Sequence, residues 1–220
     1  MKFGKTIREM TMDDRKTFLV EIYKQMFSDI NRHLTVIWQS VSVLVGAFAL
    51  LALSERNVVP ADVAISLIIL LCGWLYAHML DAGYWYNRNL VIIANIERQF
   101  LVKSDLSEIH FYWGEHRSNK NKMITHIRIQ AALGCALGTL VIAFHFSTRV
   151  FPGIIAENAL FEPLRALPYV SAIGVIIYCA WLSNDRNNAY TNFRKNSPGI
   201  DVDTTGVEYG TGHTIDDLPK

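Results

Sequence analysis

The sequence predicts an all-α membrane protein: four transmembrane helices as two hairpins, an amphipathic N-terminal helix and a helical cytoplasmic layer. The first observation behind this prediction is that four windows, 33–54, 63–80, 129–148 and 166–184, contain no Asp, Glu, Lys or Arg. An α-helix rises about 1.5 Å per residue, so about 20 apolar residues cross a hydrocarbon core about 30 Å thick. The second observation is that a charged residue stands directly at both ends of every window. The third is the uneven distribution of Lys and Arg outside the windows, which predicts orientation.

Composition agrees with this division of the chain into apolar and charged parts. Hydrophobic residues make up 51% of the 220 residues and charged residues 19%, and all the charged residues lie outside the four windows. Buried helices of a soluble bundle are the alternative. Soluble helices of this length carry a polar stripe, whereas these windows contain only scattered uncharged polar residues and histidines. The three cysteines, Cys72, Cys135 and Cys179, lie inside the windows and are expected to pack as small apolar residues.

The distribution of basic residues predicts which segments face the cytoplasm. The N-terminal stretch 1–32 and the connector 81–128 contain seven Lys or Arg each, while the loops 55–62 and 149–165 contain one and two. Cytoplasmic segments carry the excess of basic residues, so both termini and the connector are predicted to be cytoplasmic. No cleavable signal peptide is expected, because the first 32 residues are charged and amphipathic.

From Met12 onward, apolar residues repeat every three and four positions, which predicts an amphipathic helix. No Gly or Pro intervenes before Gly46, so this helix is expected to run without a break into the first span. Packing against a neighbouring helix explains the apolar face of this helix. The functional alternative is that the helix acts as a lever that couples the cytoplasm to the membrane. The chain is thus predicted to comprise the helix 1–32, a first hairpin with a cytoplasmic extension at 33–102, a basic connector at 103–128, a second hairpin with its extension at 129–197, and an acidic tail at 198–220.

Small residues four positions apart occur in two of the windows. Ser42 and Gly46 lie in the first, and Gly134 and Gly138 lie in the third. Such pairs let two helices approach closely in a membrane, where packing drives association. We therefore expect Gly134 and Gly138 to serve packing or gating, although the sequence leaves the partner helix open.

Glu97 is a carboxylate on the apolar face of the helix predicted to follow the second span. A carboxylate in such a position needs a cationic or hydrogen-bonding partner, or its pKa rises. The sequence predicts a buried pair with Arg88 or Arg32. A catalytic role for Glu97 is not expected, because no second acid or nucleophile is spaced with it.

The connector carries a basic cluster next to the third span, formed by Arg117, Lys120, Lys122 and Arg128. Anionic lipid headgroups explain such a cluster, and a phosphate-bearing ligand is the alternative. The tail 200–220 contains five acids and one base, so it is expected to be disordered or to dock on this cluster. The connector also holds histidines and an acid, but their spacing matches no metal site, and no metal is predicted: His110, Glu115, His116 and His126.

Motifs of the common enzyme classes are missing from the sequence. It contains no Walker motif, nucleophile elbow or H-E-x-x-H, so neither an enzyme nor a cofactor is predicted. The windows also lack the acids and bases that ion-coupled transporters use near the membrane midplane. His78 and His145 each lie within about one turn of a window end, where a hydrogen bond at the membrane interface explains them.

The layout of residues 13–102 is an amphipathic helix, a two-span hairpin and a helix ending in "IERQFL". It resembles the small membrane effectors of bacterial antiphage systems, the SLATT-type proteins, and is similar to the RipA-type oligomeric membrane proteins. The resemblance implies an oligomeric inner-membrane assembly whose opening permeabilises the membrane under control of a cytoplasmic signal. A nucleotide or a co-encoded soluble protein would supply that signal. Those families have one hairpin per chain and this chain has two, so their subunit number does not carry over.

These expectations combine into a homo-oligomeric, pore-type effector of the bacterial inner membrane. A non-conducting membrane scaffold or sensor that recruits a soluble partner is the alternative, and a facilitator for a small neutral solute is a third. The lipid bilayer is the expected environment, and direct binding of double-stranded nucleic acid is not expected.

Overall fold

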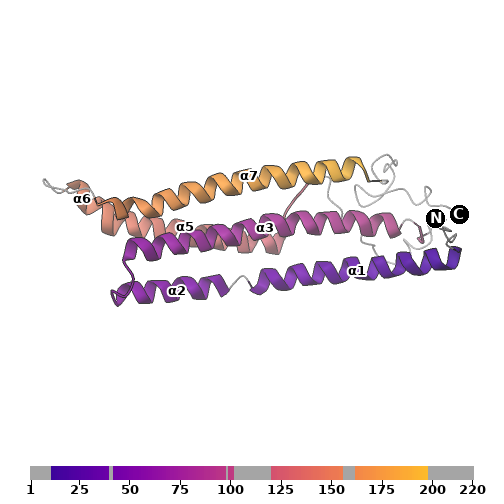
Figure 1. Ribbon diagram of the computed structural model, residues 1–220, viewed down its shortest axis with the longest axis horizontal. Helices are drawn as coiled ribbons and strands as arrows, with labels where there is room; N and C mark the ends of the chain where they lie inside the picture. Colours follow the sequence, from indigo (N-terminus) through magenta and orange to yellow (C-terminus); the bar gives the residue numbers. More distant parts are fainter. Residues whose placement is uncertain (1–10, 40–41, 98, 102–119, 156–161, 198–220) are drawn as a thin grey trace, which may run out of the picture. The chain divides into compact units, whose positions relative to one another are not determined.

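A computed structural model describes residues 11–39, 42–97, 99–101, 120–155 and 162–197 (Figure 1). All regular structure in these ranges is helical. The chain forms two compact units, each described by itself: one holds the described residues before 33, those between 89 and 101, and residue 197, and the other holds the rest. The longer helices are α1 (Met12–Gln39), α2 (Ser42–Glu55), α3 (Ala61–Glu97), α5 (Thr125–His145) and α7 (Leu167–Lys195), with the short segments η2 (Phe146–Val150), α6 (Phe151–Ile155) and η3 (Pro163–Ala166) between them.

Three continuous helical stretches are long and apolar enough to cross a membrane. They are Ala61–Glu97, Thr125–Ile155 and Pro163–Lys195. Each contains one of the predicted windows, so the second, third and fourth windows are confirmed as helices. Their length and composition indicate a multi-pass membrane protein.

The first predicted span differs from the other three. Its described residues belong to two helices, since α1 ends at Gln39 and α2 begins at Ser42. Residues 40 and 41 lie outside the described part of the chain, so the unbroken helix expected across 33–54 stays a prediction. α2 contains 14 residues, which rise about 21 Å and fall short of a hydrocarbon core about 30 Å thick. The structure thus supports three candidate spans and one shorter apolar helix.

α3 is the central helix of the unit that contains residues 33–88 (Figure 1). In its most apolar window 56% of residues are buried, against 28% for the α5 stretch and 17% for the α7 stretch. Ile68 and Cys72 of α3 pack in one cluster with Ala47 of α2 and Val141 of α5, and Val175 of α7 lies against it. A second cluster joins α3 to the start of α5: Leu75, Met79, Ala82, Ile127 and Ala131. α3 is therefore shielded by its neighbours, and the outer helices expose apolar surface.

Glycines allow the neighbours of α3 to approach closely. A Cβ on Gly134 of α5 would lie 3.1 Å from Leu75 of α3, and one on Gly138 would lie 3.8 Å from Cys72. On α3 itself, a Cβ on Gly73 would come within 2.6 Å of Val175 of α7. The partner of the small-residue pair in the third window is therefore α3 of the same chain.

α3 is much longer than a membrane is thick. Its 37 residues rise about 55 Å, and only its first half, apart from Asp62, lacks charge. Beyond that half, the side-chain amide of Asn87 donates to the backbone oxygens of Gly83 and Lys122 and to the side chain of Asn121. These bonds fix the segment that leads into α5.

Candidate functional site

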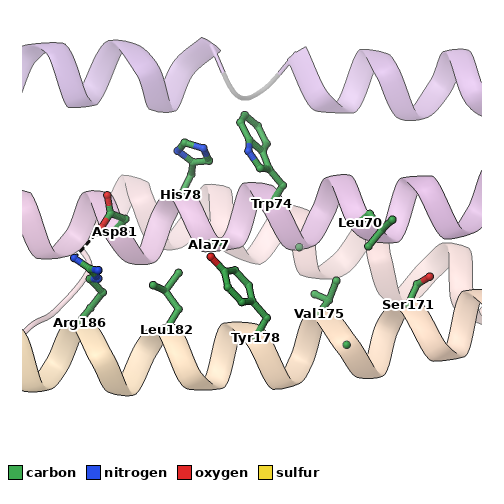
Figure 2. Close-up of a pocket in the computed structure, with 12 residues that line it drawn as sticks. Leu70, Trp74, Ala77, His78, Asp81, Ser171, Val175, Tyr178, Leu182 and Arg186 are labelled. Carbon is green, nitrogen blue, oxygen red and sulfur yellow. Dashed lines mark ion pairs between the residues drawn. The ribbon is translucent and has the colours of Figure 1, made fainter.

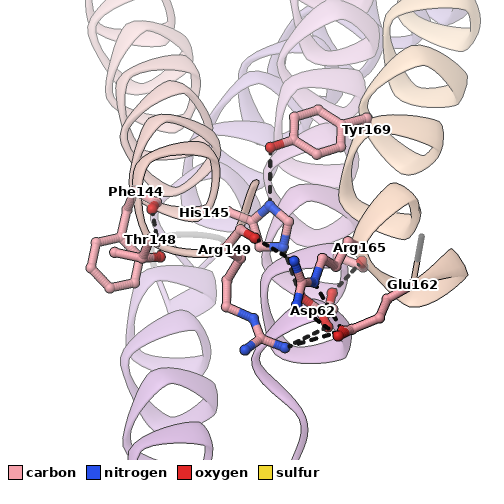
Figure 3. A network of polar contacts seen from close by, with 9 residues as sticks. Asp62, Phe144, His145, Thr148, Arg149, Glu162, Arg165 and Tyr169 are labelled. Atoms are coloured by element: carbon pink, nitrogen blue, oxygen red, sulfur yellow. Dashed lines mark hydrogen bonds and ion pairs between the residues drawn. The ribbon is translucent and has the colours of Figure 1, made fainter. Parts of the chain in front are cut away.

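Two groups of charged side chains lie near the two ends of the charge-free part of α3. Asp81 of α3 and Arg186 of α7 form one group, at the end of an open groove (Figure 2). Asp62 of α3, with His145 and Arg149 from the far end of the α5 stretch, forms the other (Figure 3). Asp62 and His145 of the second group are buried, and a contact of His145 with Tyr169 adds a third helix, so this group is the candidate functional site.

His145 is the centre of this buried group. Its side chain is fully buried, and that of Asp62 is 3% exposed. Nε2 of His145 lies 2.8 Å from Oδ1 of Asp62, and Nδ1 lies 3.0 Å from the hydroxyl of Tyr169 on α7. A carboxylate only accepts hydrogen bonds, so the contacts fit an imidazole that donates through Nε2 and accepts the Tyr169 hydroxyl at Nδ1. One histidine thus links α3, α5 and α7.

Arg149 extends the group toward the surface. Its Nη2 lies 3.4 Å from Oδ2 of Asp62 and 4.0 Å from Glu162. Arg165 holds the same Glu162 through two nitrogens, at 2.9 Å and 2.7 Å, and donates to the backbone oxygen of Arg149 at 3.0 Å. Two-pronged contacts of this kind between Arg and a carboxylate are strong and directional. The formal charges of the two acids and the two arginines cancel. We call Asp62, His145, Tyr169, Arg149, Glu162 and Arg165 the latch.

The local helix geometry explains how α5 supplies two members of the latch. Arg149 follows His145 by four positions, which places both on one face of a helix. The intervening segment η2 (Phe146–Val150) is π-helical, a rare form found frequently at functional sites. Ser147 donates to the backbone oxygens of Ala143 and Phe144, and Thr148 donates to that of Phe144. These hydroxyls help to satisfy the acceptors that a widened helix leaves in an apolar setting.

The groove beside Asp81 and Arg186 runs between α3 and α7 and has a volume of about 660 Å³. The closest Asp81–Arg186 contact is 3.4 Å, and the two side chains are 44% and 28% exposed. Arg186 also contacts Asp185 at 3.1 Å and lies over the ring of Tyr84 at 5.4 Å. This group therefore has no buried carboxylate, whereas the side chain of Asp62 in the latch is 3% exposed.

The structure places Glu97 as buried, 5% exposed, which confirms that part of the prediction. The hydroxyl of Tyr23 on α1 donates to Glu97 at 3.1 Å. Burial, the nearby carboxylate and this hydrogen bond raise the pKa of Tyr23 above its usual range, so the hydroxyl remains a donor at neutral pH. Arg32 contacts Asp29 at 3.2 Å, and Arg88 lies over the rings of Trp85 and Phe193. An ion pair of either arginine with Glu97 stays a prediction.

Two members of the predicted basic cluster come together. Lys122 and Arg128 line one cavity of about 670 Å³ with Tyr76 and apolar residues of α5. Both basic side chains are on exposed residues, as is Lys120. Arg117 and the acidic tail lie outside the described residues, so docking of the tail on this cluster stays a prediction.

The three cysteines line a common cavity of about 450 Å³ between α3, α5 and α7. Cys72 and Cys179 are buried, Cys135 is exposed, and all three are free thiols. Within the described part of the chain, no three or more His, Cys, Asp or Glu residues are arranged to hold a metal ion. Of the histidines and acid considered for a metal, only His126 lies in that part.

Sequence reasoning did not identify the latch. Asp62, Arg149 and Arg165 marked the ends of windows, and His145 was expected to form a hydrogen bond at the interface. The usable signal was the spacing of His145 and Arg149, which places an imidazole and a guanidinium on one face of an apolar helix. No family model, curated protein or solved structure matches this chain.

Proposed function

We propose that this protein is an oligomeric effector of the bacterial inner membrane that lets ions or small solutes cross under control of a cytoplasmic signal. The observation that supports the proposal most is the latch. Ionisable side chains in transmembrane segments commonly mark ion pathways or moving parts of membrane proteins, and His145 lies inside the third window with its side chain fully buried. The latch joins the ends of three candidate spans.

The latch suits a closed state that can open. A hydrogen bond to a charged group is worth about 1.5–3 kcal/mol, so the contacts of the buried Asp62 favour packed helices. Once the helices separate, the same six side chains would line a polar path rather than a dry interface. A signal that binds the separated state more tightly shifts the population toward it.

The outer helices offer the surface that an oligomer requires. Large apolar side chains of α7 are exposed, including Ile173, Ile176, Ile177 and Trp181, each between 58% and 66%. Lipid tails or the same face of another subunit would cover them. Assembly around such faces is part of the proposal, as is a role in antiphage defence, which rests on the resemblance of residues 13–102.

Flux through reconstituted liposomes tests the proposal. The full chain, Asp62→Asn and His145→Phe would be reconstituted, and efflux of potassium and of a trapped dye measured. Both variants weaken the latch, so we expect faster efflux than from the unaltered protein without any activator. Glu55→Gln is the matched control, because it removes an exposed carboxylate from the same end of the bundle.

Circular dichroism and gel filtration would first establish that each variant is folded. Efflux no faster than from empty liposomes for folded Asp62→Asn and His145→Phe would overturn the proposal and favour the non-conducting scaffold. In that case, the soluble partner would be sought on the cytoplasmic helices.

The number of spans is tested by topology. We propose four spans, with the first formed by the end of α1 together with α2, and both termini in the cytoplasm. Reporter fusions at Asn57, in the exposed α2–α3 loop, should report the periplasm, and fusions after Ser197 the cytoplasm. If α3, α5 and α7 alone cross, the two termini lie on opposite sides, and an N-terminal fusion would report the periplasm.

A further inference from the structure

We infer that the groove between α3 and α7 binds one acyl chain and the headgroup of a phospholipid that carries a primary ammonium, phosphatidylethanolamine. The groove is lined along α3 from Leu70 to Asp81 and along α7 from Ser171 to Arg186. It belongs to neither the latch nor the basic cluster, and the inference does not rest on the proposed function.

The length of the groove fits one lipid tail. The helix rise of about 1.5 Å per residue places Leu70 about 16 Å from Asp81 along α3. That distance matches half of a hydrocarbon core about 30 Å thick, which is the depth reached by the tails of one leaflet. The groove thus runs from the membrane midplane to one interface.

Small residues make the groove. Gly73 and Ala77 of α3 and Gly174 of α7 line it, with Val175 and Tyr178 between the two helices (Figure 2). A Cβ added to Gly174 would meet no atom within 4 Å, so the space beside it is open. Leu70, Trp74 and Tyr178 are between 48% and 52% exposed at its edges, so the groove opens toward the surroundings of the helices.

The polar end of the groove lies where the charge-free windows of α3 and α7 both stop. Asp81 and Arg186 face each other there (Figure 2). Arg186 also contacts the carboxylate of Asp185. The ring of Tyr84 lies under Arg186, as expected in the aromatic belt at a membrane interface. The headgroup of a lipid whose tail fills the groove would therefore reach these charges.

The charges at this end select the headgroup. Two carboxylates and one guanidinium leave one formal negative charge, so the group favours a headgroup that brings a cation. A primary ammonium has three donors for the Asp81 and Asp185 carboxylates, while the phosphate can accept from Arg186. Nε of Arg186 has no hydrogen-bond partner among the described residues, so the guanidinium has an unused donor. An anionic lipid without an amine would instead place its negative charge beside the carboxylates of Asp81 and Asp185, with no ammonium to pair with them.

Counting bound lipids by native mass spectrometry tests the inference. The full chain would be purified in mild detergent, delipidated, and mixed with phosphatidylethanolamine or phosphatidylglycerol. A Cβ at Gly174 meets no atom within 4 Å, so Gly174→Leu directs a side chain into the open space, and we expect it to lose one tightly bound phosphatidylethanolamine per chain. Ala136→Leu is the matched control, because Ala136 is exposed on α5 outside this groove and should keep that lipid.

Asp81→Asn tests the headgroup separately from the tail. It removes one carboxylate and should weaken phosphatidylethanolamine binding about fivefold, the size of an exposed ion pair of about 1 kcal/mol. Phosphatidylglycerol bound at Lys122 and Arg128 should be unchanged in both variants, which provides an internal control.

Three results would overturn the inference. The first is equal retention of phosphatidylethanolamine by Gly174→Leu and the unaltered chain. The second is phosphatidylglycerol that displaces phosphatidylethanolamine from the site lost in Gly174→Leu. The third is a change of oligomer size in Gly174→Leu with the lipid count unchanged, which would assign the groove to a second copy of the chain.

Discussion

Asp62 and Asp81 flank the same charge-free window of α3, and their surroundings differ almost completely. The side chain of Asp62 is 3% exposed and is held by His145 and Arg149, while that of Asp81 is 44% exposed and has one arginine at 3.4 Å. A buried carboxylate depends on its partners, because nothing else compensates for its lost hydration. An exposed carboxylate retains water and depends on its partner little. At the Asp62 end of α3, polar contacts of a buried carboxylate hold the helices together. At the Asp81 end, the carboxylate is exposed and available to a ligand.

Removal of the buried carboxylate should have the largest effect. Asp62→Ala removes the acceptor that His145 and Arg149 share. Each hydrogen bond to a charged group is worth about 1.5–3 kcal/mol, so we expect the free energy of unfolding to fall by about 3 kcal/mol or more. Unfolding in mixed detergent micelles, followed by circular dichroism, measures the loss. Asp81→Ala is the matched control and should cost no more than about 1 kcal/mol. If Asp62→Ala and Asp81→Ala lower the free energy of unfolding equally, the difference in burial between the two carboxylates has no effect on stability.

Glu97 adds a third carboxylate on α3, buried near the end of the helix and bonded to Tyr23. Loss of a hydrogen bond to a charged group costs about 1.5–3 kcal/mol, so Glu97→Ala should destabilise the protein by about that much. Glu97→Gln keeps an acceptor and should be milder. The yield of folded protein and the unfolding midpoint measure both. A Glu97→Ala protein that is as stable as the unaltered chain but inactive would assign Glu97 to chemistry instead.

The hydroxyl of Tyr169 is a smaller part of the latch. Tyr169→Phe removes one hydrogen bond to His145 and leaves the contact of His145 with Asp62 in place, so the expected cost is about 1 kcal/mol. The same unfolding assay applies, with His145→Phe as the comparison that should cost more. A Tyr169→Phe loss as large as that of His145→Phe would mean that the tyrosine, not the acid, holds the imidazole.

The smallest effect is expected at the open end. Asp81→Asn should change stability by about 0–1 kcal/mol, and the difference should shrink as salt rises from about 0.01 M to 1 M, because salt screens exposed pairs. Unfolding of Asp81→Asn and Asp62→Asn at both salt concentrations checks this. A cost at Asp81 that salt leaves unchanged would indicate that this end is closed in the folded protein.

The apolar windows show how much of the fold the sequence determines. Three of them coincide with helices long enough to cross a membrane, because a run of about 20 apolar residues satisfies both hydrophobic burial and backbone hydrogen bonding only as a helix. The burial of Glu97 was also predictable, since its position falls on an apolar helical face. The three apolar helices and the burial of Glu97 could be predicted because both depend on residues that are close together in the sequence.

Tertiary structure alone decided the rest. Sequence position does not distinguish Asp62 from Asp81, because both are acids at an end of the same window. Their difference arises from residues about 83 and 105 positions away, His145 and Arg186, and from the glycines that set how closely the helices approach. Helix periodicity says which residues share a face, but not which helix that face meets. The latch and the groove both depend on which helices pack against α3, and packing of the whole unit determines that arrangement.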